Sequence, residues 1–253
     1  MKNPNQLISI IIPVFNESES IGYLLDEVLN VMQNNKLNCE LIVVNDGSND
    51  NTSTVLDELT IKIKELSVIS LRKNYGQTAA MAAGFDNTKG EIVITLDGDL
   101  QNDPNDIPKL ISHINEGYDL ICGWRYERKD KLINRRIPSK IANKLIANIT
   151  GIKLHDYGCS LKAFKKEIVE DIKLYGELHR FLPVLANIEG AKIKEIKVNH
   201  RSRKYGSSKY GIDRTFRVLM DLLTVWFMTK FLTRPMYGFG FVGIISILVS
   251  LAM

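Results

Sequence analysis

The sequence predicts an α/β protein with a mostly parallel sheet covered by helices on both faces, followed by an apolar C-terminal tail. Strand and helix patterns alternate through the first half of the chain, as they do in βαβ units. The predicted strands are continuous Ile- and Val-rich runs, which is typical of strands buried on both faces. The last eighteen residues carry no charge. A chain of 253 residues has room for one α/β domain of about 200 residues and an appendage.

The individual elements follow from the period of the apolar residues. Apolar runs predict strands, and apolar residues spaced three to four apart predict helices between them. The predicted strands are 7–14, 40–44, 68–71, 91–96 and 118–122, and the predicted helices are 18–33, 52–64, 77–87 and 106–116. Neither GxGxxG nor GxxxxGK[ST] stands at a strand–helix turn, so neither a dinucleotide fingerprint nor a P-loop is predicted.

Acidic and polar turns follow three of the predicted strands, at residues 13–18, 45–50 and 97–101. Asp97 and Asp99 stand one residue apart after the strand at 91–96, and Gly98 between them allows a sharp turn. Two carboxylates spaced in this way can reach one hard cation, and Gln101 adds a neutral oxygen. An isolated pair of this kind is more often a solvated turn, but open α/β sheets bind ligands at the carboxyl ends of their strands. Asp46, which closes the second strand, is a candidate partner for a base or ribose.

Charge and cysteine content narrow the class of protein. The net charge is +4, and nine of the Lys and Arg residues fall within residues 192–217. Such a basic segment fits a nucleic acid, an anionic membrane surface or a phosphate substrate. We disfavour nucleic acid, because the acidic turns would repel its phosphates unless a metal were bound. Three scattered cysteines fit a reducing compartment rather than a disulfide framework.

The C-terminal tail predicts attachment to a membrane. Residues 235–253 are nearly long enough to span a bilayer, and we expect the natural chain to continue beyond them. Lys230 and Arg234 precede this span, which by the positive-inside tendency predicts that the large N-terminal domain lies in the cytoplasm. Residues 214–234 form a helical pattern with a wide apolar face, suited to the membrane interface or to docking on the preceding domain or a second protomer. The predicted division is therefore 1–213, 214–234 and 235–253.

Several motifs, in order, resemble glycosyltransferase family 2, whose members have the GT-A fold. The first half carries PVFNE, VVNDGSNDNT, LRKNYGQTAAMAAGF and TLDGDLQNDP. The second half carries DYGCSLKAF, HRFLP and NHRSR with a following GSSKY, which are similar to the polyprenyl-phosphate glycosyltransferases, including dolichyl-phosphate mannose synthases. The resemblance covers about residues 7–215, and it is specific because the motifs are several and ordered.

The resemblance implies a nucleotide-sugar donor, UDP- or GDP-linked, and a polyprenyl phosphate acceptor of the undecaprenyl or dolichyl type. It implies that Mg²⁺ or Mn²⁺ neutralises the diphosphate leaving group and that the configuration at the sugar is inverted. The implied donor-site residues are Pro13, Phe15, Glu17, Asp46 and Ser48 around the nucleotide, with Asp97, Asp99 and Gln101 as the metal ligands.

The acceptor chemistry decides between members of this family. A phosphate monoester is largely a dianion at neutral pH and attacks without a general base. We expect the chain to lack both the Glu-Asp base of hydroxyl-directed members and the QxxRW motif of processive synthases, and both absences would favour a phosphate acceptor. The expected phosphate ligands are Arg203 and Lys209, with weaker candidates in Arg125, Arg136 and Lys162. Two alternatives remain: a catalytically silent, membrane-bound scaffold that binds sugar nucleotides, and a transferase acting on a hydroxyl group. A homo-oligomer is compatible with either.

Overall fold

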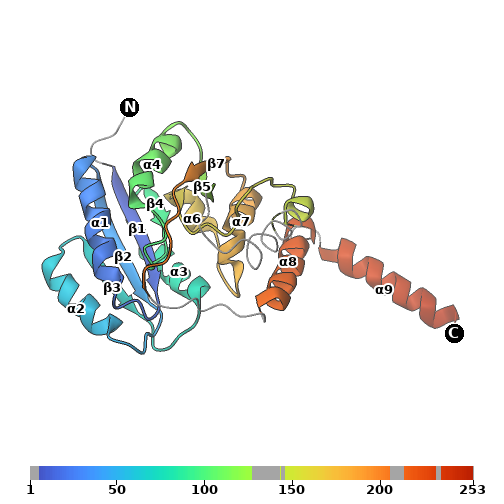
Figure 1. Cartoon of the computed structure of the whole chain (residues 1–253). Coiled ribbons are helices and arrows are strands. Elements are labelled where there is room, and N and C mark those ends of the chain that lie inside the picture. Colours follow the sequence, from blue (N-terminus) through green and yellow to red (C-terminus); the bar gives the residue numbers. More distant parts are fainter. Residues whose placement is uncertain (1–5, 127–142, 144–145, 206–213, 232–234, 253) are drawn as a thin grey trace.

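A seven-stranded sheet forms the centre of the described part of the chain (Figure 1). The computed structural model describes residues 6–126, 143, 146–205, 214–231 and 235–252. In spatial order the strands are β3 (Leu66–Ser70), β2 (Asn38–Asn45), β1 (Leu7–Val14), β4 (Ile92–Thr95), β6 (Lys162–Lys165), β5 (Leu120–Arg125) and β7 (Ile193–Val198). β6 runs antiparallel to both of its neighbours, and the other pairings are parallel. The predicted mostly parallel α/β sheet is confirmed.

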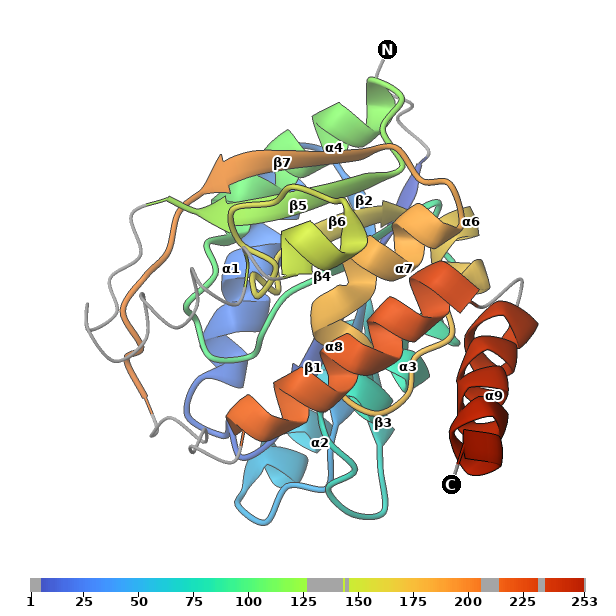
Figure 2. The same cartoon turned by 90° about the vertical axis from the view of Figure 1, so that its right-hand side faces the viewer.

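Helices cover both faces of this sheet, because the central strands are apolar on both sides. Ile8, Ile10 and Ile12 of β1 face one core, while Ile11 faces the other. The first core is closed by α1 (Ile21–Asn34), α2 (Thr52–Lys62) and α4 (Ile107–Asn115), with the short helix η1 (Pro104–Asp106) before α4. The second is closed by α3 (Gln77–Phe85), α6 (Lys166–Asp171), η3 (Leu178–Phe181) and α7 (Leu182–Ile188) (Figure 2).

The helix α8 (Arg214–Phe231) docks on this second core and still presents apolar side chains to solvent. Leu222 and Val225 are buried against the domain, and the Tyr175 hydroxyl donates to the Met228 sulfur at 3.2 Å. On other sides of the helix, Leu223 is 56% exposed and Trp226 38% exposed. Docking on the preceding domain, one of the three arrangements expected for residues 214–234, is therefore present for α8, and some of its apolar side chains remain exposed.

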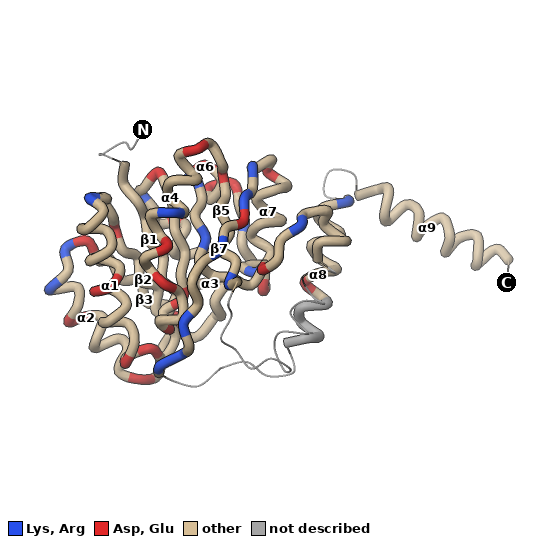
Figure 3. The backbone as a smooth tube through the Cα atoms, turned by 45° about the horizontal axis from the view of Figure 1, so that its top comes forward, with Lys and Arg blue, Asp and Glu red and all other residues tan. Residues whose placement is uncertain are grey.

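The helix α9 (Pro235–Ala252) projects away from the domain on the side where α8 lies (Figure 1). None of its residues is buried, and none is charged (Figure 3). This helix has 18 residues and a mean hydropathy of 1.8. By length and composition it could therefore cross a membrane.

The carboxyl ends of β1, β2 and β4 meet at one edge of the sheet, as the parallel pairing of these strands requires. The three acidic and polar turns of the sequence leave from this edge. Gly98 sits so close to β1 that a Cβ there would lie 2.7 Å from the Val14 side chain and 3.7 Å from that of Glu17. The glycine therefore lets the turn after β4 pack directly on the turn after β1.

Candidate active site

The acidic turn after β4, residues 97–101, is tightly wound and partly buried. Leu100 adopts a left-handed backbone conformation with φ of +61°, which is rare for a bulky residue and is sustained only when the surroundings fix it. The backbone N–H of Gln101 donates to Asp99 Oδ1 at 3.1 Å, and the N–H of Asp97 donates to Asn102 Oδ1 at 3.2 Å. These bonds hold both carboxylates at the carboxyl edge of the sheet.

A segment that follows β7, residues 199–203, lies antiparallel along the end of this turn; we call it the strap. Asn102 and His200 form an isolated antiparallel bridge, and the backbone N–H of Arg201 donates to the Gln101 carbonyl at 2.9 Å. The Arg201 guanidinium then reaches Asp103 at 2.8 Å and Glu27 of α1 at 2.6 Å. The strap is therefore fastened to the acidic turn and to the helix behind it.

Arg203, at the end of the strap, enters the acidic cluster. Its guanidinium donates to Asp99 Oδ2 at 2.5 Å and lies 3.7 Å from Glu17 Oε1. Burial, and then the neighbouring Asp97 carboxylate, raise the pKa of Asp99 to about 6, although Arg203 opposes the shift. The carboxylates of Asp99 and Glu17 thus contact this guanidinium, and Asp97 acts on Asp99, so the negative charge of the cluster exceeds the positive.

The nucleotide side of the predicted site is formed by the turns after β1 and β2. The backbone N–H of Asn16 donates to the Ser48 hydroxyl at 2.9 Å, which ties the two turns together. Asp46 is buried, and its two oxygens accept from the backbone N–H groups of Tyr75 and Gly76 at 2.7 and 2.9 Å. Burial raises the pKa of Asp46 even though these bonds oppose the shift. Asp46 was predicted to contact a base or ribose; in the structure its carboxylate holds the loop before α3.

Two of the predicted phosphate ligands have partners inside the protein instead. Arg125 makes a bidentate pair with Asp156, at 2.7 and 2.9 Å, and both side chains are largely buried. The Lys162 ammonium is buried and donates to the backbone carbonyls of Tyr157 and Cys159. These contacts engage both cations within the protein, so the assignment of Arg125 and Lys162 to the phosphates stays a prediction.

Most of the other predicted residues lie at the carboxyl ends of β1, β2 and β4, in the turns that follow these strands, or in the strap packed on them. They are Pro13, Phe15, Glu17, Ser48, Asp97, Asp99, Gln101 and Arg203. Arg136 and Lys209 lie outside the described residues.

Sequence reasoning missed three residues that organise this site. Gln77, the first residue of α3, donates through Nε2 to Asp97 Oδ1 at 2.8 Å. Asn102 accepts from Asp97 and also from the Ser160 hydroxyl, at 2.8 Å. Arg201 fastens the strap. All three lie inside the motifs quoted above, and their membership of these motifs is the sequence signal that could have identified them.

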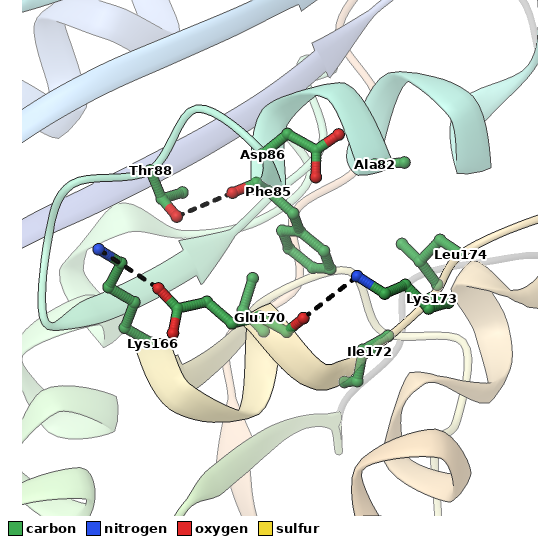
Figure 4. A pocket seen from close by; sticks show the side chains of 10 residues that line it. Ala82, Phe85, Asp86, Thr88, Lys166, Glu170, Ile172, Lys173 and Leu174 are labelled. Carbon is green, nitrogen blue, oxygen red and sulfur yellow. Dashed lines mark hydrogen bonds and ion pairs between the residues drawn. The ribbon is translucent and has the colours of Figure 1, made fainter.

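A cavity of about 550 Å³ lies elsewhere, between α3 and α6 (Figure 4). The register pairs Ile92 with Lys165, so α6 leaves the sheet at the edge opposite to Asp97. Lys166 and Glu170 in the wall of this cavity pair with each other at 3.5 Å. The chain does contain a Glu-Asp dipeptide, Glu170–Asp171, contrary to our expectation, but α6 carries it at this far edge.

The comparisons with known proteins agree with this arrangement. The family model described as Glycosyl transferase family 2 matches residues 9–173, which include the turns after β1, β2 and β4 and end before the strap. This chain belongs to glycosyl transferase family 2.

Two relatives in the family are similar over most of the chain. The dodecaprenyl-phosphate galacturonate synthase of Rhizobium johnstonii is 46% identical over 243 residues, which are 94% of this chain and 71% of that protein. The undecaprenyl-phosphate 4-deoxy-4-formamido-L-arabinose transferase of Proteus mirabilis is 40% identical over 218 residues, 86% of this chain and 67% of that protein.

A solved structure shows the same fold. Glucosyl-3-phosphoglycerate synthase from Mycobacterium tuberculosis, crystallised with Mn²⁺ and uridine-diphosphate-glucose, aligns with a TM-score of 0.68 at 18% identity. The alignment covers 89% of this chain and 79% of that chain. The family's GT-A fold, expected from the motifs, is confirmed.

The Arg125–Asp156 pair yields a prediction about stability. Replacing Asp156 with alanine leaves a buried guanidinium without its partner, which typically costs about 3–5 kcal/mol of the free energy of unfolding. The control is Glu170→Ala, which removes an exposed ion pair of the kind worth roughly 0.5 kcal/mol. Urea unfolding in detergent micelles measures both. Equal changes in the two variants would contradict the structural role of the buried pair.

Proposed function

We propose that this chain transfers a sugar, with inversion, from a nucleotide-sugar donor to a polyprenyl phosphate at the cytoplasmic face of a membrane. The observation that carries the proposal is the cluster of Asp97, Asp99 and Arg203 at the carboxyl edge of a family 2 fold. The two relatives described above, whose names specify dodecaprenyl and undecaprenyl phosphate, support the choice of acceptor.

The donor occupies the crevice between the turns after β1, β2 and β4. In this proposal Pro13, Phe15, Glu17 and Ser48 face the nucleoside, which is UDP- or GDP-linked. Asp46 contributes indirectly, because it fixes the loop of Tyr75 and Gly76 that forms one wall. The diphosphate then lies over Asp97 and Asp99.

The residues of the acidic turn fit a divalent cation, Mg²⁺ or Mn²⁺. Asp97, Asp99 and Gln101 supply oxygen donors, which hard cations prefer. The raised pKa of Asp99 and the excess of carboxylates around Arg203 indicate a place where added positive charge is favourable. Within the described ranges no group of three His, Cys, Asp or Glu residues is found that could hold a metal alone, and in this proposal oxygens of the donor diphosphate would add to the two aspartates and Gln101. When bound, the cation would neutralise the charge that develops on the leaving group.

Arg203 and Lys209 provide the positive charge for the phosphates. Arg203 already lies against Asp99, and its planar guanidinium suits phosphate oxygens. We assign it to the boundary between the diphosphate and the attacking lipid phosphate, and Lys209 to the lipid phosphate. The dianionic acceptor is itself the nucleophile, so its oxygen forms the new bond to the anomeric carbon as the nucleoside diphosphate leaves. No proton has to be removed.

Membrane placement brings the lipid to this site. We propose that residues 1–213 form the catalytic domain, residues 214–234 an interfacial helix and residues 235–253 a membrane span. Leu223 and Trp226 on the outward side of α8, next to the charge-free α9, support this division. Lys230, before the span, supports the cytoplasmic orientation.

A panel of nucleotide sugars tests the proposed function. Purified protein is incubated with undecaprenyl phosphate in detergent micelles, a divalent cation and UDP- or GDP-linked sugars, and lipid products are identified by mass spectrometry. We expect one donor to give a polyprenyl-phosphate sugar. Tight binding of a nucleotide sugar without turnover would favour a silent scaffold instead. Transfer to a hydroxyl acceptor alone would favour the alternative transferase.

Asp99→Asn should abolish transfer while leaving the fold intact. Loss of one charge-assisted contact typically costs about 1.5–3 kcal/mol, so Mn²⁺ binding in the presence of nucleotide should weaken roughly ten- to a hundredfold. The control is Asp86→Asn, which changes an exposed aspartate at the end of α3. Titration calorimetry and circular dichroism give the two readouts. Full transfer by Asp99→Asn, or by the wild-type protein in excess EDTA, would contradict the metal assignment.

The outward side of α8 should lie in the lipid headgroup region. The chain has two tryptophans, so Trp124→Phe leaves the fluorescence of Trp226 alone and Trp226→Phe leaves that of Trp124. In vesicles of brominated phospholipid we expect strong quenching of Trp226 and much weaker quenching of Trp124, which stacks on His155 beside the sheet. Unquenched Trp226 in membrane-bound protein would show that α8 stands clear of the bilayer.

A further inference from the structure

The contact between Gln77 and Asp97 joins two parts of the site that the motifs treat as separate. Gln77 belongs to the segment between β3 and β4, and Asp97 follows β4. The Gln77 amide donates to Asp97 Oδ1 at 2.8 Å across a sequence separation of 20 residues. Both side chains are partly exposed, so the bond lies at the rim of the crevice rather than in the core.

The position of Gln77 is fixed from both sides. On the nucleotide side, Asp46 accepts from the two backbone N–H groups that immediately precede it, those of Tyr75 and Gly76. Gly76 has φ of +94°, a conformation that favours glycine, so the chain turns there into α3. On the other side, the Thr78 hydroxyl contacts His179 Nδ1 at 2.7 Å. The first turn of α3 is therefore clamped between β2 and η3.

The loop before Gln77 also packs closely on the turn after β2. A Cβ at Gly47 would lie 2.3 Å from the carbonyl carbon of Lys73, so only glycine admits this approach. The contacts thus run from the turn after β2, through the loop of residues 73–76, to the amide of Gln77. They end on a carboxylate of the acidic turn.

A neutral amide is well suited to orient a metal-binding carboxylate. It stabilises the ionised form by donating a hydrogen bond, and it adds no positive charge that would repel a cation. The bond restrains the rotation of Asp97, which reduces the entropy lost when the carboxylate binds a metal. Partners of this kind, one step removed from the metal, typically change its affinity by about 10- to 100-fold.

We propose that Gln77 is a positioning residue that orients Asp97 for the divalent cation. It thereby connects the nucleotide wall held by Asp46 to the metal ligand. This inference rests on the proposed function, because it assigns Asp97 to the metal. Gln77 touches neither the sugar nor the acceptor in this account, and its effect passes through Asp97.

The test replaces Gln77 with methionine, which has a similar length and no donor. Gln6→Met is the matched control, because the Gln6 amide also donates to a carboxylate, that of Glu91, at 3.3 Å on the surface. Mn²⁺ binding to the whole 253-residue chain in the presence of UDP is measured by titration calorimetry, and the unfolding midpoint is recorded for each variant. A second variant, Gln77→Ala, removes the same bond with a different side chain.

We expect both Gln77 variants to bind Mn²⁺ roughly 10- to 100-fold more weakly than the wild-type protein, with an unchanged unfolding midpoint. The Gln6 variant should bind as the wild-type protein does. Wild-type affinity in the Gln77 variants would overturn this inference and leave the proposed function standing. A wild-type protein that binds no Mn²⁺ with any nucleotide would overturn the proposed metal, and the role of Gln77 with it.

Discussion

The antiparallel contact between the strap and the acidic turn is the constraint on which the site depends. It joins residues 101–103 to residues 199–203 through the bridge of Asn102 and His200, and Arg201 extends it to α1. The same segment brings Arg203 to Asp99. This pairing thus brings the second half of the chain to the acidic turn of the first.

The same contact settles the electrostatics of the site. Glu17, Asp97 and Asp99 come from the turns after β1 and β4, and each would repel the others if left alone. Arg203 reduces this repulsion and lowers the pKa of Asp99, against the effects of burial and of Asp97. The cluster still carries more negative than positive charge. An acidic site with one guanidinium at its edge suits a cation bound together with phosphates, because the cation meets the carboxylates and the guanidinium meets the phosphate oxygens.

Local patterns predicted much of the fold and part of the site. The strand at residues 7–14 and the helices after it follow from runs and periods of apolar residues, and the acidic turn follows from its place after a strand. The short strand β6, with lysine at both ends, gave no such signal. Lys162 resembles a surface cation in sequence, but its ammonium is buried against two backbone carbonyls. Such pairings depend on tertiary contacts, as does that of Arg203 with Asp99 across 104 residues.

The central chemical claim of this account is that the reaction needs no general base, because the lipid phosphate is already ionised and is itself the nucleophile. The most direct measurement compares undecaprenyl phosphate with undecaprenol, the alcohol of the same chain, as acceptors at equal concentration with the preferred donor. The account predicts transfer to the phosphate and none detectable to the alcohol. Comparable rates with both acceptors would contradict the account. A hydroxyl acceptor needs a general base, and the site would then have to contain one.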